Sequence, residues 1–241
     1  MSLALEFKKL RRTGCLAALV LAGLLAAAVP VVNMAVRSEN YISLPGDPFH
    51  ILADANWQMM AMLNILAVIC GACMMYHTEY ADNGFQKMQV LPVSQDAMFL
   101  GKFVIIALLL VLMLALQTAS LVGCAAHWFA SYEFELSGVL ASAGFQLAVT
   151  LPTVMLMLVI ASACKNMWIS LGIGVILVFT LSIMPQDNAV LSMLPFSAPY
   201  QLLSNAQADG REWLFIGVCA AQTVLFGAAE FIYLKARRNF E

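Results

Sequence analysis

Few residue patterns in this chain match the spacing of a catalytic or metal-binding site. The three histidines stand apart, and His77 and Glu79 lack the i, i+4 spacing that places two zinc ligands on one helix face. Residues 162–165 have the SxxK spacing of a serine nucleophile with its lysine, but no partner motif accompanies them. No GxxxxGK sequence followed by Ser or Thr occurs, so the chain has no nucleotide-binding P-loop. We therefore expect no catalytic residue, no metal site and no cofactor in this chain.

Polar side chains inside long apolar runs are the remaining candidates for function. In a membrane they either hydrogen-bond between helices or line a transport path, because an unpaired polar group in hydrocarbon is costly. Glu230 is the costliest, and it lies five residues before Lys235, where water or the basic tail could satisfy it. We expect a structural role for Glu230, since no second intramembrane acid completes a proton relay. The candidates are Asn64, Gln117, Gln146, Gln222 and Glu230.

Composition places the chain in a membrane. It has 241 residues, of which 62% are hydrophobic and 11% charged, and its mean hydropathy is +0.86. Soluble domains carry about 25% charged residues. A membrane-spanning helix needs about 20 apolar residues. Six runs are long enough, and they predict an all-α polytopic membrane protein with six transmembrane helices over about 14–36, 57–76, 103–126, 136–164, 166–186 and 213–234.

Lysine and arginine predict the orientation of these helices. With both termini in the cytoplasm, ten of the twelve basic residues fall on the cytoplasmic side, and only Arg37 and Arg211 fall outside. The net charge of −2 is thus the sum of unequally distributed charges, with most basic residues on the cytoplasmic side. It gives no indication of nucleic-acid binding. The localisation we expect is a bacterial cytoplasmic membrane, with the chain crossing it several times.

Two further segments differ from plain connections. Residues 1–13 place Leu3, Phe7 and Leu10 at helical spacing among basic residues, which predicts a short amphipathic helix at the cytoplasmic interface. Residues 187–211 are too apolar for a simple loop and too short and Pro-broken to span the bilayer. We expect there an outer re-entrant segment or a pair of short helices lying at the interface.

The segment 77–102, between the second and third spans, is the longest cytoplasmic connection. It contains an acid just after the second span, the run Gln86-Lys87-Met88-Gln89-Val90-Leu91-Pro92-Val93-Ser94, and a closing Gly101-Lys102. With the six-span layout, this pattern resembles the permeases of ABC-2-type transporters. The opening residues 6–13 are similar to the lantibiotic-immunity and bacitracin-resistance group of those permeases.

The resemblance implies a membrane subunit without catalytic activity of its own. ATP and Mg²⁺ would be bound and ATP hydrolysed by a separate ABC ATPase subunit, and a second permease chain, identical or paralogous, would complete the transport route. Membrane lipid surrounds such a protein, and no nucleic acid is involved.

By the same resemblance, 77–102 is a coupling segment that docks on the ATPase. A helix over residues 83–90 would be ended by Pro92. Phe85, Met88 and Leu91 would make the apolar contacts. The full set of contacts implied is Asp82, Gly84, Phe85, Gln86, Lys87, Met88, Leu91 and Pro92.

The function implied is an ATP-driven exporter that expels an amphiphilic, lantibiotic-like peptide antibiotic from the membrane and so gives immunity or resistance. Export of another drug or of a lipid remains an alternative. An ion-coupled secondary carrier is less favoured, because such carriers place paired acids or broken helices at mid-membrane and this chain offers only Glu230.

Overall fold

The computed structural model describes residues 7, 9–10, 13–80, 95–130, 133–183 and 188–240, with side chains up to residue 236 in the last helix. Over these residues the protein is all-helical and contains five long apolar helices and a shorter one, which confirms the predicted all-α polytopic membrane fold. The long helices are α2 (Cys15–Arg37), α4 (Pro48–Tyr80), α6 (Gln95–Trp128), α7 (Leu136–Ala163) and α11 (Glu212–Phe240).

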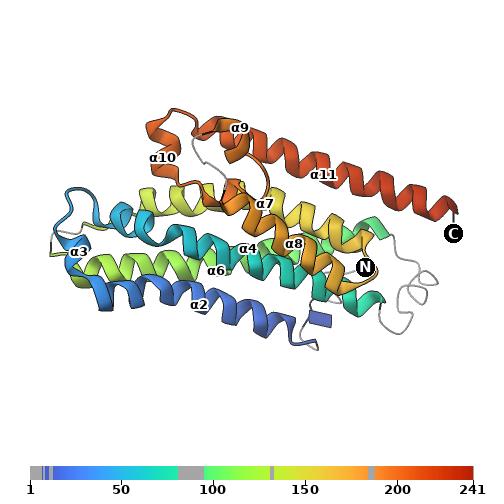
Figure 1. The fold of residues 1–241 in the computed structure, drawn as a ribbon, viewed down its shortest axis with the longest axis horizontal. Helices are drawn as coiled ribbons and strands as arrows, with labels where there is room; N and C mark the ends of the chain where they lie inside the picture. The colour runs from blue at the N-terminus through green and yellow to red at the C-terminus, as the bar shows by residue number, and fades with distance from the viewer. Residues whose placement is uncertain are drawn as a thin grey trace.

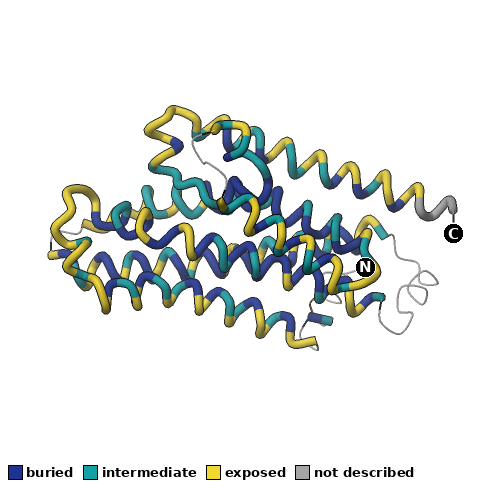
Figure 2. The backbone as a smooth tube through the Cα atoms, viewed as in Figure 1, coloured by how far each residue is buried: buried dark blue, intermediate teal, exposed yellow. Residues whose placement is uncertain are grey.

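The long helices run side by side, with α4 in the middle (Figure 1). It contacts α2, α6, α7 and the shorter α8 (Met167–Ser182), whereas α11 packs mainly on α7. In the most apolar stretch of α4, 67% of the residues are buried, against 22% in α11 and 28% in α2. Figure 2 shows the same contrast along the helices. The apolar faces that α2 and α11 leave exposed suit contact with lipid.

Both helices that flank residues 81–94 extend beyond the apolar runs in the sequence. The second run was expected over 57–76, but α4 begins at Pro48 and has 33 residues. The third was expected from 103, but α6 begins at Gln95 and has 34 residues. At 1.5 Å per residue each helix is about 50 Å long, against about 30 Å of hydrocarbon. The polar turns continue the helix because backbone hydrogen bonding does not depend on side-chain polarity.

Helix α8 is short for a membrane crossing. It has 16 residues, and the Asn166 side chain caps it by accepting from the backbone N–H of Trp168. Its length is about 24 Å, less than the hydrocarbon thickness of about 30 Å. The predicted span over 166–186 thus appears as a shorter helix that packs against α4.

The segment between α8 and α11 contains short helical pieces. These are α9 (Ala189–Ser192), the 3-10 helix η2 (Ala198–Tyr200) and α10 (Leu203–Ala208). Of these, η2 packs on α4 and α7, and α10 packs on α7 and α11 (Figure 1). A further short helix, α3 (Glu39–Ile42), joins α2 to α4. The depth of the 187–211 segment in a membrane stays a prediction.

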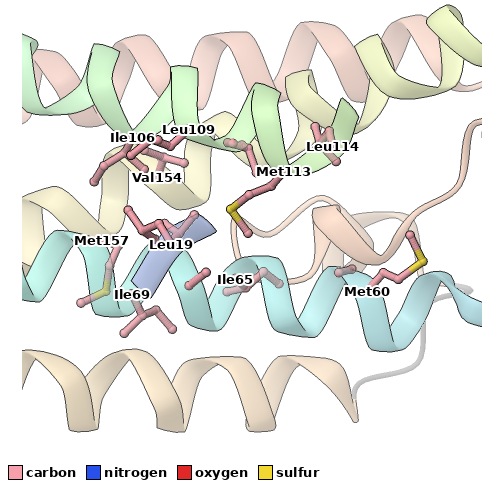
Figure 3. Packing of buried hydrophobic residues seen from close by; sticks show 14 of the residues in the cluster. Leu19, Met60, Ile65, Ile69, Ile106, Leu109, Met113, Leu114, Val154 and Met157 are labelled. Atoms are coloured by element: carbon pink, nitrogen blue, oxygen red, sulfur yellow. The ribbon is translucent and has the colours of Figure 1, made fainter. Parts of the chain in front are cut away.

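The core lies between α2, α4, α6 and α7 and is rich in methionine and branched aliphatic side chains (Figure 3). Glycines let neighbouring helices approach closely. A Cβ at Gly23 of α2 would lie 2.9 Å from Met113 Cγ of α6, and one at Gly174 of α8 would lie 2.8 Å from Ile69 Cγ2 of α4. Of the expected interfacial helix 1–13, only residues 7, 9, 10 and 13 are described, so that helix stays a prediction.

Candidate functional site

The predicted ATPase contact falls in a gap in the described chain. Residues 81–94 lie outside the described residues, and so do all eight contact candidates: Asp82, Gly84, Phe85, Gln86, Lys87, Met88, Leu91 and Pro92. The helices on either side are described. The end of α4 and the start of α6 lie at the same end of the bundle, which is the predicted cytoplasmic end (Figure 1).

A buried ion pair joins these two helices next to the gap. Glu79, in the last turn of α4, accepts a hydrogen bond from Lys102 Nζ of α6, at 2.7 Å from Oε1. Lys9 Nζ, from the N-terminal segment, lies 3.3 Å from the same oxygen. The side chains of Glu79 and Lys102 are only 3% and 1% exposed, whereas Lys9 is 34% exposed. Lys102 was counted among the cytoplasmic basic residues that set the orientation, and the structure buries its side chain in the bundle.

Two tyrosines of α4 extend this cluster. Lys102 Nζ lies 5.0 Å from the centre of the Tyr76 ring, within the range of a cation–π contact. The rings of Tyr76 and Tyr80 stack with their centres 6.2 Å apart. The Tyr80 hydroxyl donates to the backbone carbonyl of Ser162, in the last turn of α7. Residues 76, 79 and 80 share one face of α4, because i, i+3 and i+4 positions are neighbours on a helix.

Glu230 of α11 belongs to the same region. Its side chain is 0% exposed, and its Oε1 accepts a hydrogen bond from Ser162 Oγ at 2.5 Å. Tyr76 lies close enough to interact electrostatically with both Glu79 and Glu230. The sequence left either water or the basic tail as the partner of Glu230; the structure buries the side chain and gives it Ser162 of α7 as a hydrogen-bond donor.

We call this set of side chains the inner polar network. It ties four long helices and the N-terminal segment together at the predicted cytoplasmic end. Its members are Lys9, Tyr76, Glu79, Tyr80, Lys102, Ser162 and Glu230.

Two of the polar residues singled out within the spans meet in the middle of the bundle. Asn64 Nδ2 of α4 donates to Gln117 Oε1 of α6 at 3.0 Å, and Gln117 Nε2 donates back to Asn64 Oδ1 at 2.6 Å. Both side chains are buried, at 3% and 0% exposure. Each amide satisfies the other, so this pair joins α4 to α6 at mid-length, as helix-packing residues do.

The other two polar candidates, Gln146 and Gln222, bind the segment between α8 and α11, which is predicted to lie on the outer side. Gln146 Nε2 of α7 donates to the carbonyl of Gln201 at 2.7 Å, and Gln222 Nε2 of α11 donates to the carbonyl of Met193 at 3.0 Å. Thr153 donates its hydroxyl proton to the carbonyl of Pro195. Side chains of the long helices thus satisfy backbone carbonyls of the broken segment, which a low-dielectric surrounding requires.

Trp57 of α4 takes part in the same anchoring. Its indole N–H donates to the carbonyl of Pro199 at 2.9 Å, and the side chain is 4% exposed. We call Trp57, Gln146, Thr153 and Gln222 the outer anchors. They come from three different long helices and hold residues 193–201 against the bundle.

Comparison with known families decides the class of the protein. A family model described as ABC-2 family transporter protein matches residues 2–181, which is more than half of the chain. The chain belongs to this family of ABC-2 transporter proteins. The match takes in α2, α4, α6, α7 and most of α8, together with the segment between α4 and α6. No curated protein sequence matches the permease at a significant level.

The ABC-2 permease is the transmembrane component of an ABC transporter and is not itself the ATPase, and its family implies an ABC ATPase as partner. Among the residues that the structure describes, no group of three His, Cys, Asp or Glu side chains is placed to hold a metal ion. All six cysteines are free thiols.

The inner polar network was largely missed by reasoning from sequence. Glu79 and Lys102 were taken as part of a polar connection, because the apolar runs stop at residue 76 and resume at residue 103. A signal was present: Tyr76, Glu79 and Tyr80 repeat at helical spacing beyond the apolar run. Glu79 lies about one turn after the second run and Lys102 directly before the third, so the two are placed to pair once both helices continue.

Proposed function

We propose that this ABC-2 permease is the membrane subunit of an exporter that expels an amphiphilic peptide antibiotic and so gives immunity or resistance. A separate ATPase subunit binds ATP and Mg²⁺ and docks on the segment 77–102, with Phe85, Met88 and Leu91 as its apolar contacts. A second permease chain completes the transport route.

The place of the coupling segment is the observation that carries this proposal. Residues 81–94 connect α4 to α6, and a buried ion pair joins these two helices next to the connection. Helix α4 contacts the long helices α2, α6 and α7 as well as the shorter α8. A displacement of the α4 end therefore moves a helix that contacts most of the bundle. A permease that is driven by a separate ATPase subunit requires such a connection.

Two observations support an amphiphilic cargo. Residues 6–13 are similar to permeases of the lantibiotic-immunity and bacitracin-resistance group. Helices α2 and α11 expose mostly apolar side chains along their length. A peptide that has partitioned into the bilayer meets these faces without crossing water, since burial of its apolar surface in the membrane is favourable.

Purification of the tagged permease from mild detergent tests the coupling contact. We expect a Walker-motif ATPase to co-purify at a fixed ratio. Phe85→Glu and Met88→Glu should remove it while the permease stays in the membrane. Leu44→Glu and Phe134→Glu are matched controls, because both side chains are exposed, 48% and 58%, at the opposite end of the bundle. Loss of the ATPase in the controls, or its retention in the Phe85 and Met88 variants, would contradict the docking assignment.

The cargo is tested separately in cells. Deletion of the permease should increase sensitivity to a lantibiotic, and the wild-type chain should restore resistance. A strain indifferent to its deletion under lantibiotic challenge would rule out this cargo and leave the ATPase-driven permease in place. Export abolished by a protonophore but insensitive to ATP depletion would instead indicate a secondary carrier.

A further inference from the structure

The inner polar network is costly for folding, which raises the question of what it contributes. Transfer of two charges from water into a protein interior carries a desolvation penalty that their attraction only partly offsets. Two apolar side chains of similar volume at positions 79 and 102 would often be as stable or more so. The ion pair is therefore poorly explained as a means of stabilising the bundle.

A hydrogen-bonded ion pair, unlike an apolar contact, depends on the relative position and orientation of its two groups. Apolar side chains can slide past each other with little change in buried area, whereas a hydrogen-bonded carboxylate and ammonium hold one register. Glu79 Oε1 and Lys102 Nζ are 2.7 Å apart, and Lys9 binds the same oxygen. Movement of the α4 end relative to α6 would break this contact, so the two helix ends must move as one body.

We propose that the Glu79–Lys102 pair is a positioning pair that passes an ATP-driven displacement of the α4 end into the rest of the bundle. This inference rests on the proposed function and deepens it, because it names the described residues through which the ATPase acts. The pair itself touches neither ATP nor cargo.

The route continues from α4 through α7 to α11. The hydroxyl of Tyr80, the residue after Glu79, donates to the backbone carbonyl of Ser162 on α7. The hydroxyl of Ser162 in turn donates to Glu230 of α11 at 2.5 Å. Each of these contacts is directional, and each joins a different pair of helices.

A second contact reaches α11 from α6. The rings of Phe99 and Phe231 meet edge to face with their centres 6.1 Å apart, and Phe99 is 1% exposed. Helix α11 is otherwise the least buried of the long helices. The inner polar network thus holds α11 near Glu230, at the predicted cytoplasmic end. The exposed face of α11 can move against lipid. A displacement of α11 therefore reports whether the movement of α4 is passed on.

A reporter on α11 makes this testable without a known cargo. Ile232 is 70% exposed and lies near Glu230 in sequence. The complex of permease and co-purified ATPase carries an Ile232→Cys substitution labelled with an environment-sensitive fluorophore, with the six native cysteines replaced. The measurement is the emission shift when ATP, Mg²⁺ and vanadate trap the ATPase, together with the rate of ATP hydrolysis.

Three variants separate coupling from folding. Glu79→Leu with Lys102→Met removes both charges of the pair together, so that neither partner is left buried without the other. Glu79→Asp with Lys102→Arg keeps one negative and one positive charge at these positions but changes the lengths of the two side chains. Asn64→Leu with Gln117→Leu is the matched control, because it removes a buried polar pair between the same two helices, away from the network.

We expect the neutral 79/102 variant to keep its ATPase and to hydrolyse ATP, with an emission shift reduced about threefold or more. The Asp/Arg variant should recover at least half of the wild-type shift, and the 64/117 control should retain it. A wild-type shift in the neutral variant would overturn the inference. Loss of ATPase binding and hydrolysis together with the shift would also overturn it, since the pair would then be purely structural. No ATPase, or no shift, with the wild-type chain would overturn the proposed function and the coupling role with it.

Discussion

Lys102 exposes 1% of its side chain and Glu79 exposes 3%, and the more exposed Lys9 is a second partner of Glu79. Removal of one partner of a buried pair costs up to about 3–5 kcal/mol, whereas removal of both leaves neither partner of the pair behind. Lys102→Met alone should therefore lower the melting temperature in detergent clearly more than Lys102→Met combined with Glu79→Leu. Equal losses in the two variants would mean that Lys9 compensates Glu79 fully.

The amide pair at mid-length predicts a similar non-additive effect of smaller size. Asn64→Leu leaves the Gln117 amide buried without its partner, which costs about 1–3 kcal/mol. The double variant Asn64→Leu/Gln117→Leu should be more stable than Asn64→Leu alone, as measured by thermal unfolding. A double variant as unstable as the sum of the single ones would show that the two amides act independently.

Among the elements, α8 depends on a close approach to α4. A side chain at Gly174 would meet Ile69 at 2.8 Å and Met157 at 3.1 Å, whereas no heavy atom lies within 4 Å of a Cβ at Gly172 of the same helix. Ile69 is β-branched and cannot turn away easily. Gly174→Val should therefore destabilise the permease by about 1–3 kcal/mol. Gly172→Val, with the same change in propensity and open space around it, should have a much smaller effect on melting.

Element type was predictable from the sequence, but helix ends were not. Long apolar runs can only be helices in a bilayer, so the α-helical membrane fold followed from hydropathy. The ends of α4 and α6 did not, because hydropathy measures lipid contact and both helices continue through polar turns such as Tyr76–Tyr80. The contact of Glu230 with Ser162 was not predictable for the same reason: distance along the chain from an apolar end does not tell which way the side chain faces.

The candidate site was predictable in part. The position of the 77–102 segment between two spans, and its likeness to ABC-2 permeases, came from the residues themselves. The pairing of Glu79 with Lys102, and of Asn64 with Gln117, joins residues that are 23 and 53 positions apart. Such pairs depend on how the helices are packed, which no local pattern specifies.

For the molecule as a whole, each of the outer anchors contributes one hydrogen bond that holds residues 193–201 against the bundle. Thr153→Val removes the donor to the Pro195 carbonyl, and the loss of one hydrogen bond, about 1 kcal/mol, should raise protease cleavage within this segment about fivefold. Thr118→Val is the control, because Thr118 donates only to carbonyls of its own helix, at Leu114 and Ala115. Equal cleavage of both variants would mean that Thr153 does not restrain the segment.

The ion pair between α4 and α6 also affects the cost of docking an ATPase. It fixes the separation of the ends of α4 and α6, so the entropic cost of bringing these two helix ends together is met during folding of the permease. A partner that binds at these helix ends then loses less conformational freedom on binding, and its affinity is higher by that amount. The neutral 79/102 variant should accordingly retain its ATPase but bind it with a less favourable entropy, which calorimetry can measure.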